Sequence, residues 1–276
     1  MQLNKWFCFR KCLLVGMLLL VAGHTAYAQR VYNLRWQTET LLAGFGIASG
    51  GTGFVVGRDL SPLSPEDILL LNRNQVFRID RKATYWASSR AGTSSDLLFY
   101  GASLAPLILL TNPRARKEAI TVSVLYTEAI AITAGLTQLS KNMVLRSRPY
   151  VYNQGYSVEK KQQKDARKSF FSGHTSSTAV SCFFAAQVWS DFHPESRLKP
   201  VVWSIAAVIP AITGYLRMRA GQHFLTDVSA GYVVGGLVGW LVPTLHNNKR
   251  LGNKGLSLYG GGENIGLVWR FSSGAP

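Results

Sequence analysis

Six apolar segments constrain the fold of this 276-residue chain more than any other feature of its sequence. Several approach the ~20 residues that a helix needs to cross the hydrocarbon core of a bilayer, although one is short. None is extremely hydrophobic, so we expect helices that pack on one another through partly polar faces. The predicted fold class is therefore all-α, as a multi-helix transmembrane bundle. The apolar segments are residues 41–57, 97–111, 119–139, 175–191, 201–216 and 228–245.

The first 28 residues have the pattern of a secretory signal peptide. A basic n-region precedes an apolar h-region, and a small-x-small cleavage site follows. We therefore expect the mature chain to begin at Gln29. The basic residues are Lys5, Arg10 and Lys11, the apolar stretch is 12–23, and the cleavage site is Ala26-Tyr27-Ala28.

The charge balance favours anionic membrane partners. The whole chain carries a formal charge of +16, and removal of residues 1–28 takes away three cations and no carboxylate, which leaves about +13. Such a charge suits contact with anionic lipid headgroups or phosphates. The cations flank apolar segments and form no separate basic domain, so we expect no nucleic-acid partner.

Cysteine usage points to no disulfide or thiolate metal site. Cys8 and Cys12 lie in the signal peptide, which leaves Cys182 as the one cysteine of the mature chain. An intrachain disulfide needs two cysteines, so the mature chain has none. Cys182 stands inside an apolar segment, where we expect it to be a small buried hydrophobe.

Composition divides the chain into four segments. The connection between the first two apolar segments is basic, and Ser64-Pro65 within it suggests a helix start. Residues 77–81 suggest part of an amphipathic helix at the membrane interface. The expected segments are the signal peptide (1–28), an N-terminal apolar segment with a basic amphipathic connection (29–96), a catalytic helical domain (97–246) and a tail (247–276).

Glycines mark two further structural features. Gly260-Gly261-Gly262 separates two stretches rich in β-formers, which predicts a short β-hairpin-like tail at the C-terminus. Gly231, Gly235 and Gly239 form a ridge of small residues on the last apolar segment, which favours close helix packing. We expect that ridge to pack within the monomer, with a dimer interface as the second reading, and the oligomeric state stays open.

The first polar motif is Lys141-x6-Arg148-Pro149. A spacing of seven residues is two helical turns, so we expect Lys141 and Arg148 on one helix face. Pro149 would then end the helix. Taken alone, such a pair at the end of a membrane helix is more often a basic flank whose charges reach the interface.

The second motif is Ser172-Gly173-His174, which comes directly before Thr175 and an apolar run. Small capping residues before such a run predict a helix N-terminus, where free backbone N–H groups can bind an anion. Gly173 would let a phosphate approach the backbone closely. Taken alone, this tripeptide is usually a loop or a cap.

The third motif is Arg217-x5-His223-x3-Asp227. His223 and Asp227 are four residues apart, which predicts that they stack on one helix face. Arg217 is poorly spaced to share that face, and Ala220-Gly221 is a plausible turn between them. A lone His-x3-Asp pair is more often structural than catalytic.

Together the three motifs supply what phosphoryl transfer to a histidine requires. Lysine and arginine neutralise phosphoryl oxygens, and arginine adds a planar bidentate fork. A histidine beside a carboxylate is oriented and can act as a nucleophile. A second histidine can protonate the leaving oxygen. Each motif is weak alone, but three of them in this order at the ends of apolar segments are hard to obtain by chance.

This combination resembles the tripartite signature of the type 2 phosphatidic acid phosphatase (PAP2) superfamily, over about residues 95–245. The family includes membrane lipid phosphatases, soluble acid phosphatases and vanadium haloperoxidases, and the resemblance implies a PAP2/haloperoxidase-like helical core. Two positions depart from the family pattern. Phe171 stands where proline is usual, and Leu216 where serine is usual, so we expect altered packing rather than lost activity.

The resemblance also implies a role for each site residue. His223 is the nucleophile that forms a phosphohistidine, Asp227 orients it, and His174 is first the acid and then the base. Arg219 also lies four residues from His223, but the five-residue spacing favours Arg217 as the phosphate clamp. The phosphate-binding set is Lys141, Arg148, Ser172, Gly173 and Arg217.

The expected function is metal-independent hydrolysis of a lipid phosphate or pyrophosphate monoester, with no cofactor. The substrate could be phosphatidic acid, phosphatidylglycerophosphate, a polyprenyl pyrophosphate or lipid A. A soluble periplasmic acid phosphatase is a second candidate, which the long apolar segments disfavour. The small size disfavours a vanadate-dependent haloperoxidase. The intact His223–Asp227 pair disfavours a non-enzymatic phospholipid-binding membrane protein.

Localisation depends on the number of spans. We expect a bacterial inner-membrane protein with its active site facing the periplasm, which a cleavable signal makes more natural. That orientation holds if segment 41–57 does not span; if it spans, the first motif falls inside. Segment 41–57 is rich in glycine and is a weak span, and charge does not decide because most loops are basic.

Overall fold

The structure is a computed structural model that describes residues 30–248 and the strands at 256–261 and 264–269. The chain divides into the units Met1–Val31 and Tyr32–Pro276, and everything below concerns the second. The signal peptide expected at residues 1–28 lies outside the described residues, so it stays a prediction.

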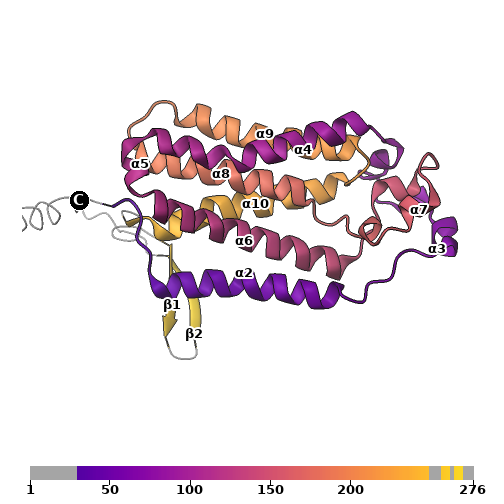
Figure 1. Ribbon diagram of the computed structural model, residues 1–276, viewed down its shortest axis with the longest axis horizontal. Coiled ribbons are helices and arrows are strands. Elements are labelled where there is room, and N and C mark those ends of the chain that lie inside the picture. Colours follow the sequence, from indigo (N-terminus) through magenta and orange to yellow (C-terminus); the bar gives the residue numbers. More distant parts are fainter. Residues whose placement is uncertain (1–29, 249–255, 262–263, 270–276) are drawn as a thin grey trace, which may run out of the picture. The chain divides into compact units, whose positions relative to one another are not determined.

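Six long helices carry the described fold, and five of them each contain one of the expected apolar segments (Figure 1). Segment 97–111 is divided between α4 and a following 3₁₀ turn, η3 (Ala105–Thr111). The long helices are α2 (Trp36–Gly57), α4 (Ser89–Ser103), α6 (Ala119–Val144), α8 (Gly173–Phe192), α9 (Lys199–Arg219) and α10 (Leu225–His246). Shorter elements join them: α3 (Pro65–Leu70), η1 (Arg73–Gln75), η2 (Arg81–Tyr85), α5 (Pro113–Lys117), η4 (Pro149–Tyr152), α7 (Val158–Lys161) and η5 (Lys164–Arg167).

Five of these helical segments are long and apolar enough to cross a membrane. They are Trp36–Gly57, Ser89–Thr111, Ala119–Tyr152, Lys199–Arg219 and Leu225–His246. The all-α, membrane-embedded character of the chain is thereby supported. Segment 41–57, a weak span by its glycine content, belongs to the first of them.

Helix α8 lies at the centre of the bundle. It packs on α10, α9, α4 and α6, whereas α2 packs along α6 (Figure 1). Most α8 side chains are buried, among them Cys182, which is a free thiol with 5% of its surface exposed. The prediction of a small buried hydrophobe at Cys182 is confirmed.

The glycine ridge of α10 faces α8, as expected for packing within the monomer. A Cβ atom built on Gly231 would lie 2.6 Å from the carbonyl oxygen of Ser172, and one on Gly239 would lie 2.5 Å from that of Val180. Gly235 approaches the carbonyl oxygen of Ser176 more closely still. The ridge therefore lets the backbones of the two central helices touch.

Replacing Gly235 with alanine should destabilise the protein by at least about 1–3 kcal/mol, because a rigid backbone must move to admit the methyl group. A lower thermal unfolding temperature in detergent would measure this loss. Gly44→Ala on α2 is the matched control, since no described residue outside the local helix backbone has an atom within 4 Å of the added Cβ. That change should leave stability equal or higher. Equal unfolding temperatures for Gly235→Ala and the unchanged protein would contradict the packing.

The connection between α2 and α4 differs from the expected amphipathic helix. Ser64 caps α3 through a reciprocal pair of hydrogen bonds with Asp67, which confirms a helix start at Ser64-Pro65. Residues 78–80, however, form a turn, and residue 81 begins η2, so 77–81 is not part of an amphipathic α-helix. Asp80 is buried and accepts hydrogen bonds from the backbone N–H and hydroxyl of Thr226 at 3.0 and 2.6 Å. A buried carboxylate with these partners ties the connection to the first turn of α10.

The C-terminal strands β1 (Leu256–Gly261) and β2 (Asn264–Trp269) pair antiparallel, with Leu256 opposite Trp269. The expected β-hairpin-like tail has no support beyond this backbone pairing and stays a prediction. Helix α4 runs across residue 96, so the boundary expected between residues 29–96 and 97–246 falls inside a helix.

Candidate active site

Lys141 and Arg148 come from different elements, so the prediction that they share a helix face is wrong. Helix α6 ends at Val144, and Leu145 adopts a left-handed conformation with φ 50°. Arg148 is extended, with φ −72° and ψ 153°. The residue before a proline avoids the α conformation, which explains why the helix cannot continue to Arg148.

Arg148 is nevertheless held firmly at the site. Its side chain donates to the backbone oxygen of Asp165 at 2.9 Å and pairs with the Asp165 carboxylate at 2.8 Å. It also donates to Oε1 of Gln222 at 2.8 Å, in the turn that precedes α10. With 4% of its surface exposed, Arg148 has a guanidinium with a fixed direction.

Ser172 caps helix α8, as the second motif predicts. Its hydroxyl accepts from the backbone N–H and the hydroxyl of Thr175, at 3.4 and 2.8 Å. Gly173 is the first residue of the helix, and a Cβ atom built on it would lie 3.6 Å from Nζ of Lys141. The Lys141 ammonium therefore stands beside the helix N-terminus, where the dipole and free N–H groups also favour an anion.

His174 points toward a carboxylate that the sequence analysis missed. Its Nε2 donates to Oδ1 of Asp96 at 2.9 Å, and NH1 of Arg217 donates to the same oxygen at 3.2 Å. Arg217 also donates to the hydroxyl of Ser95 at 3.3 Å, whereas its buried Nε has no hydrogen-bond partner among the described residues. Asp96 on α4 thus bridges the second and third motifs.

Arg217 and Arg219 have different surroundings. Arg217 lies in the last turn of α9 with 9% of its surface exposed. Arg219 is exposed, donates to the hydroxyl of Tyr215 at 3.1 Å, and lies over the ring of Trp86 at 5.3 Å. Gly221 follows with φ +68°, a conformation that glycine adopts freely, so the expected turn at Ala220-Gly221 is confirmed.

His223 lies before α10 rather than on it, because the helix begins at Leu225. The prediction that His223 and Asp227 stack on one helix face is therefore wrong. Nδ1 of His223 is 2.7 Å from the backbone oxygen of Ser169 and 3.8 Å from Oδ2 of Asp227. A carbonyl oxygen only accepts, so Nδ1 carries the proton and Nε2 keeps its lone pair.

Asp227 is a fully buried carboxylate that fixes the surroundings of His223. It accepts from the Ser169 hydroxyl at 2.5 Å and from the backbone N–H of Phe224 at 2.8 Å. Arg146 pairs with Asp227, and its other terminal nitrogen pairs with Asp80 at 2.8 Å. Asp227 therefore holds the Ser169 segment that orients the imidazole, as well as the start of α10.

All eight site residues chosen from the sequence lie within one family match. The PAP2 superfamily model matches residues 122–251. This segment is a PAP2 domain. The site residues within it are Lys141, Arg148, Ser172, Gly173, His174, Arg217, His223 and Asp227.

One solved structure is similar to this chain at 19% sequence identity and a TM-score of 0.40. It is the crystal structure of the first transmembrane PAP2 type phosphatidylglycerolphosphate phosphatase from Bacillus subtilis. The alignment covers 75% of this chain and 91% of that one. No curated protein matches the chain.

The two departures from the PAP2 pattern have different surroundings. Phe171 is buried, with 5% of its surface exposed, and its ring lies 6.1 Å from that of Phe170. Leu216 is partly buried beside Arg217. Neither supplies charge to the site, and both lie next to residues that keep their expected places.

The electrostatics of the PAP2 site keep both histidines neutral in the absence of substrate. The pKa of His223 is lowered to about 3, chiefly by burial and also by the charges of Arg148 and Lys141, whereas Asp227 acts in the opposite direction. Burial also lowers the pKa of His174 to about 4, with Arg217 acting in the same direction and Asp96 against it. At neutral pH, His223 therefore has the free lone pair that a nucleophile needs.

The cations of the PAP2 site act on one another. The positive charges of Arg148 and Arg217 repel that of Lys141. Those of Arg148 and Lys141 disfavour protonation of His223. Asp165 pairs with Arg148 and Asp96 with Arg217, which offsets part of this positive charge. The remaining excess of positive charge favours binding of an anion between the three cations.

Four supporting residues escaped the sequence analysis: Asp80, Asp96, Arg146 and Ser169. Their partners are distant in sequence, such as Asp80 with Thr226, 146 residues apart. Asp96 stands next to an apolar segment, and Arg146 lies within the first motif. No spacing rule connects these residues to the histidines.

Proposed function

We propose that this protein is a metal-independent phosphatase that hydrolyses a lipid phosphate or pyrophosphate monoester through a phosphohistidine. PAP2 membership supports a phosphatase. The observation that carries the finer proposal is the buried His223, whose Nδ1–H donates to the Ser169 carbonyl. This leaves Nε2 as a nucleophile beside Lys141 and Arg148.

In the first step, Nε2 of His223 attacks phosphorus while the bond from phosphorus to the leaving oxygen breaks. The leaving oxygen takes a proton from His174 and departs as an alcohol, or as a phosphate when the substrate is a pyrophosphate. A bound phosphate dianion beside His174 raises its pKa and so favours the protonated form. Lys141, Arg148, Arg217 and the N-terminus of α8 stabilise the phosphoryl oxygens.

In the second step, His174 is neutral and accepts a proton from water. The water oxygen attacks phosphorus, the bond from phosphorus to Nε2 breaks, and inorganic phosphate leaves. Asp227 stabilises the arrangement of Ser169 that keeps His223 in the reactive tautomer. Asp96 accepts hydrogen bonds from His174 and Arg217 in the substrate-free site. When substrate binds, these two donors must turn from Asp96 to the phosphate.

A lipid substrate is supported by an apolar cavity near the site. A cavity of about 380 Å³ lies between α9 and α10, lined mainly by apolar side chains such as Met218, Leu225 and Val228. Met218 adjoins Arg217 in sequence, and Leu225 lies two residues after His223. An acyl or prenyl chain can therefore lie in this cavity while its phosphate occupies the site.

The five apolar helices disfavour the alternative of a soluble acid phosphatase. A vanadate-dependent haloperoxidase would share the cradle for an oxyanion. It would oxidise halide when vanadate is added, and we expect no such activity.

We propose an inner-membrane location with the active site facing the periplasm. Helix α2 ends at Gly57 beside Asn142, at the catalytic end of α6. If α2 spans the membrane, a periplasmic site requires its N-terminus on the cytoplasmic side, which excludes a cleaved signal before it.

Thiol labelling in intact cells tests this orientation with the variants Ser61→Cys and Ser196→Cys. A reagent that does not cross the inner membrane should modify the cysteine at 61 and not the one at 196. Modification at 196 alone would place the catalytic end in the cytoplasm.

Phosphate release from a panel of lipid phosphates in detergent, with and without EDTA, tests the proposal. Because the three cations replace a metal in neutralising the phosphoryl oxygens, initial rates should survive brief chelation. Vanadate should inhibit, since its trigonal-bipyramidal form resembles the transferring phosphoryl group. Complete loss of activity in EDTA, restored by Mg²⁺, would contradict the mechanism.

His174→Ala should slow hydrolysis of a lipid phosphate by roughly 10²–10⁴-fold, the usual contribution of general acid catalysis. An activated leaving group such as p-nitrophenolate needs less protonation, so its hydrolysis should slow less. The ratio of kcat values on the two substrates measures this difference. Equal losses on both would show that His174 is not the acid.

A further inference from the structure

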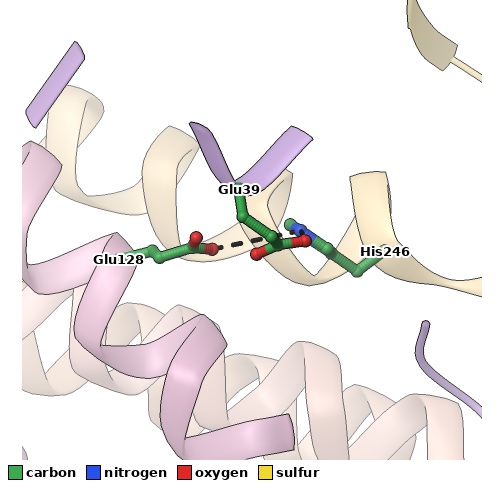
Figure 2. A group of neighbouring side chains, drawn as sticks. All are labelled: Glu39, Glu128 and His246. Atoms are coloured by element: carbon green, nitrogen blue, oxygen red, sulfur yellow. Dashed lines mark hydrogen bonds and ion pairs between the residues drawn. The ribbon is translucent and has the colours of Figure 1, made fainter. Parts of the chain in front are cut away.

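A second polar cluster lies away from the active site, toward the N-terminal halves of α2 and α6 and the C-terminal end of α10. Glu39 in the first turn of α2, Glu128 of α6 and His246 at the end of α10 point toward one another (Figure 2). One ligand atom from each lies within 4.8 Å of the others. The catalytic residues belong to the C-terminal end of α6 and the N-terminal end of α10, so this cluster is separate from them.

The two ring nitrogens of His246 have different partners, and Nε2 faces the two carboxylates. Its Nδ1 lies 2.7 Å from the backbone oxygen of Val242, which can only accept, so Nδ1 carries a proton. Nε2 lies 3.0 Å from Oε1 of Glu39 and 3.9 Å from Oε2 of Glu128. A carboxylate also only accepts, so Nε2 donates to Glu39 in the metal-free cluster. A metal ion that displaces this proton would meet three ligand atoms, Nε2 and one oxygen of each glutamate.

Burial makes this arrangement unfavourable unless a positive charge joins it. His246 and Glu128 have 1% and 7% of their surfaces exposed. Oε2 of Glu39 and Oε2 of Glu128 are buried, and neither has a hydrogen-bond partner in the part of the chain that the structure describes. Among the described residues, His246 is the one cationic group recorded within 4.0 Å of either carboxylate. Two carboxylates in such a place carry a large desolvation penalty.

We propose that Glu39, Glu128 and His246 bind a divalent transition-metal ion of the Zn²⁺ type. One imidazole and two carboxylates form a mixed nitrogen and oxygen ligand set that suits Zn²⁺ and its neighbours. The 2+ charge of the ion balances the two carboxylates. A ligating histidine commonly donates its other ring N–H to a backbone carbonyl, as His246 does to Val242.

The distances between ligand atoms fit such an ion. Ligand atoms bound at about 2.0–2.1 Å in a tetrahedral site are about 3.3 Å apart. The distances of 3.0 and 3.9 Å from Nε2 to the two carboxylates bracket that value. Small rotations of the glutamate side chains would equalise them, and water can take the fourth position. Glu39 keeps 22% of its side chain exposed, which leaves a route for the ion.

The site would have a structural role. The three ligands belong to three helices, and α2 otherwise packs mainly along α6. A metal bound here ties α2 and the end of α10 to α6. A metal ion that binds the folded protein but not the unfolded chain stabilises the folded state by mass action. Zinc should therefore raise the unfolding temperature, and it takes no part in the phosphatase reaction.

Metal analysis of the full-length protein in detergent, after exposure to Zn²⁺ alone and removal of free ion, tests the site. We expect about one Zn²⁺ per chain and an unfolding temperature that rises with Zn²⁺ but not with Mg²⁺. Glu128→Gln and Glu39→Gln keep the side-chain shape and should weaken Zn²⁺ binding at least about 100-fold. Glu66→Gln removes an exposed carboxylate elsewhere and should change neither measurement.

Co²⁺ provides a second readout, because its visible spectrum reports coordination by nitrogen and oxygen ligands. That spectrum should appear with the unchanged protein and be lost in His246→Ala. The proposal would be overturned if the unchanged protein bound no Zn²⁺ and the Glu128→Gln variant were more stable than the unchanged protein in metal-free buffer. The cluster would then be two carboxyl groups that share a proton.

Discussion

Replacing His223 with alanine is expected to abolish phosphatase turnover, with a loss of roughly 10⁴-fold or more in kcat. The reaction needs Nε2 as the attacking atom, and none of the other side chains assigned to the site can take its position. The imidazole is buried and neutral, and its orientation depends on the Ser169 carbonyl. Phosphate release from a lipid phosphate at saturating substrate measures the change.

His193→Ala is a suitable control for the loss of a histidine. His193 lies at the opposite end of α8, where its ring contacts Asn112 and the backbone of Trp189. Its replacement should leave kcat within a few fold of the unchanged protein. Substantial turnover by His223→Ala, in protein that unfolds at the normal temperature, would show that another group attacks phosphorus.

Arg217→Ala should lower kcat/KM by roughly 10²–10³-fold or more, because a charge-assisted contact to the phosphoryl group is lost in a buried site. Arg217→Lys should be nearly as harmful, since lysine cannot reproduce the planar fork. Kinetics of both variants on one lipid phosphate measure the effect.

Arg219→Ala provides the matched comparison, two residues away. Arg219 is exposed and stacks over Trp86, so its loss should preserve most of kcat. It should change mainly the affinity for anionic lipid surfaces and its dependence on salt. The reverse outcome, with Arg219 essential and Arg217 dispensable, would mean that the third motif is aligned wrongly.

Features set by local chemistry could be predicted from the sequence. Ser172 caps α8 because a small hydroxyl before an apolar run suits that position, and Gly221 makes the turn because it tolerates positive φ. The glycine ridge of α10 follows from its four-residue spacing. Each of these outcomes depends on residues within one or two turns of chain.

Features that depend on distant partners could not be predicted. Spacing alone suggested that Lys141 and Arg148 share a helix, but Leu145 ends α6 and the Arg148 N–H bonds to the backbone oxygen of Ala166. The partner of His223 is a backbone oxygen 54 residues away. Every residue has a backbone carbonyl, so the sequence does not indicate which one accepts this hydrogen bond. Glu39 and His246 are 207 residues apart, so nothing linked them before the helices were placed.

The central claim is that phosphorus is transferred to His223, and mapping of a trapped phosphoenzyme tests it most directly. Rapid base quenching of the protein during turnover preserves a phosphorus–nitrogen bond, which acid then hydrolyses. Peptide mass spectrometry should find one acid-labile phosphate on the peptide that contains His223, and none in His223→Ala. Phosphate on a serine or on His174, or no phosphoenzyme in protein whose pre-steady-state burst has been observed, would contradict the account.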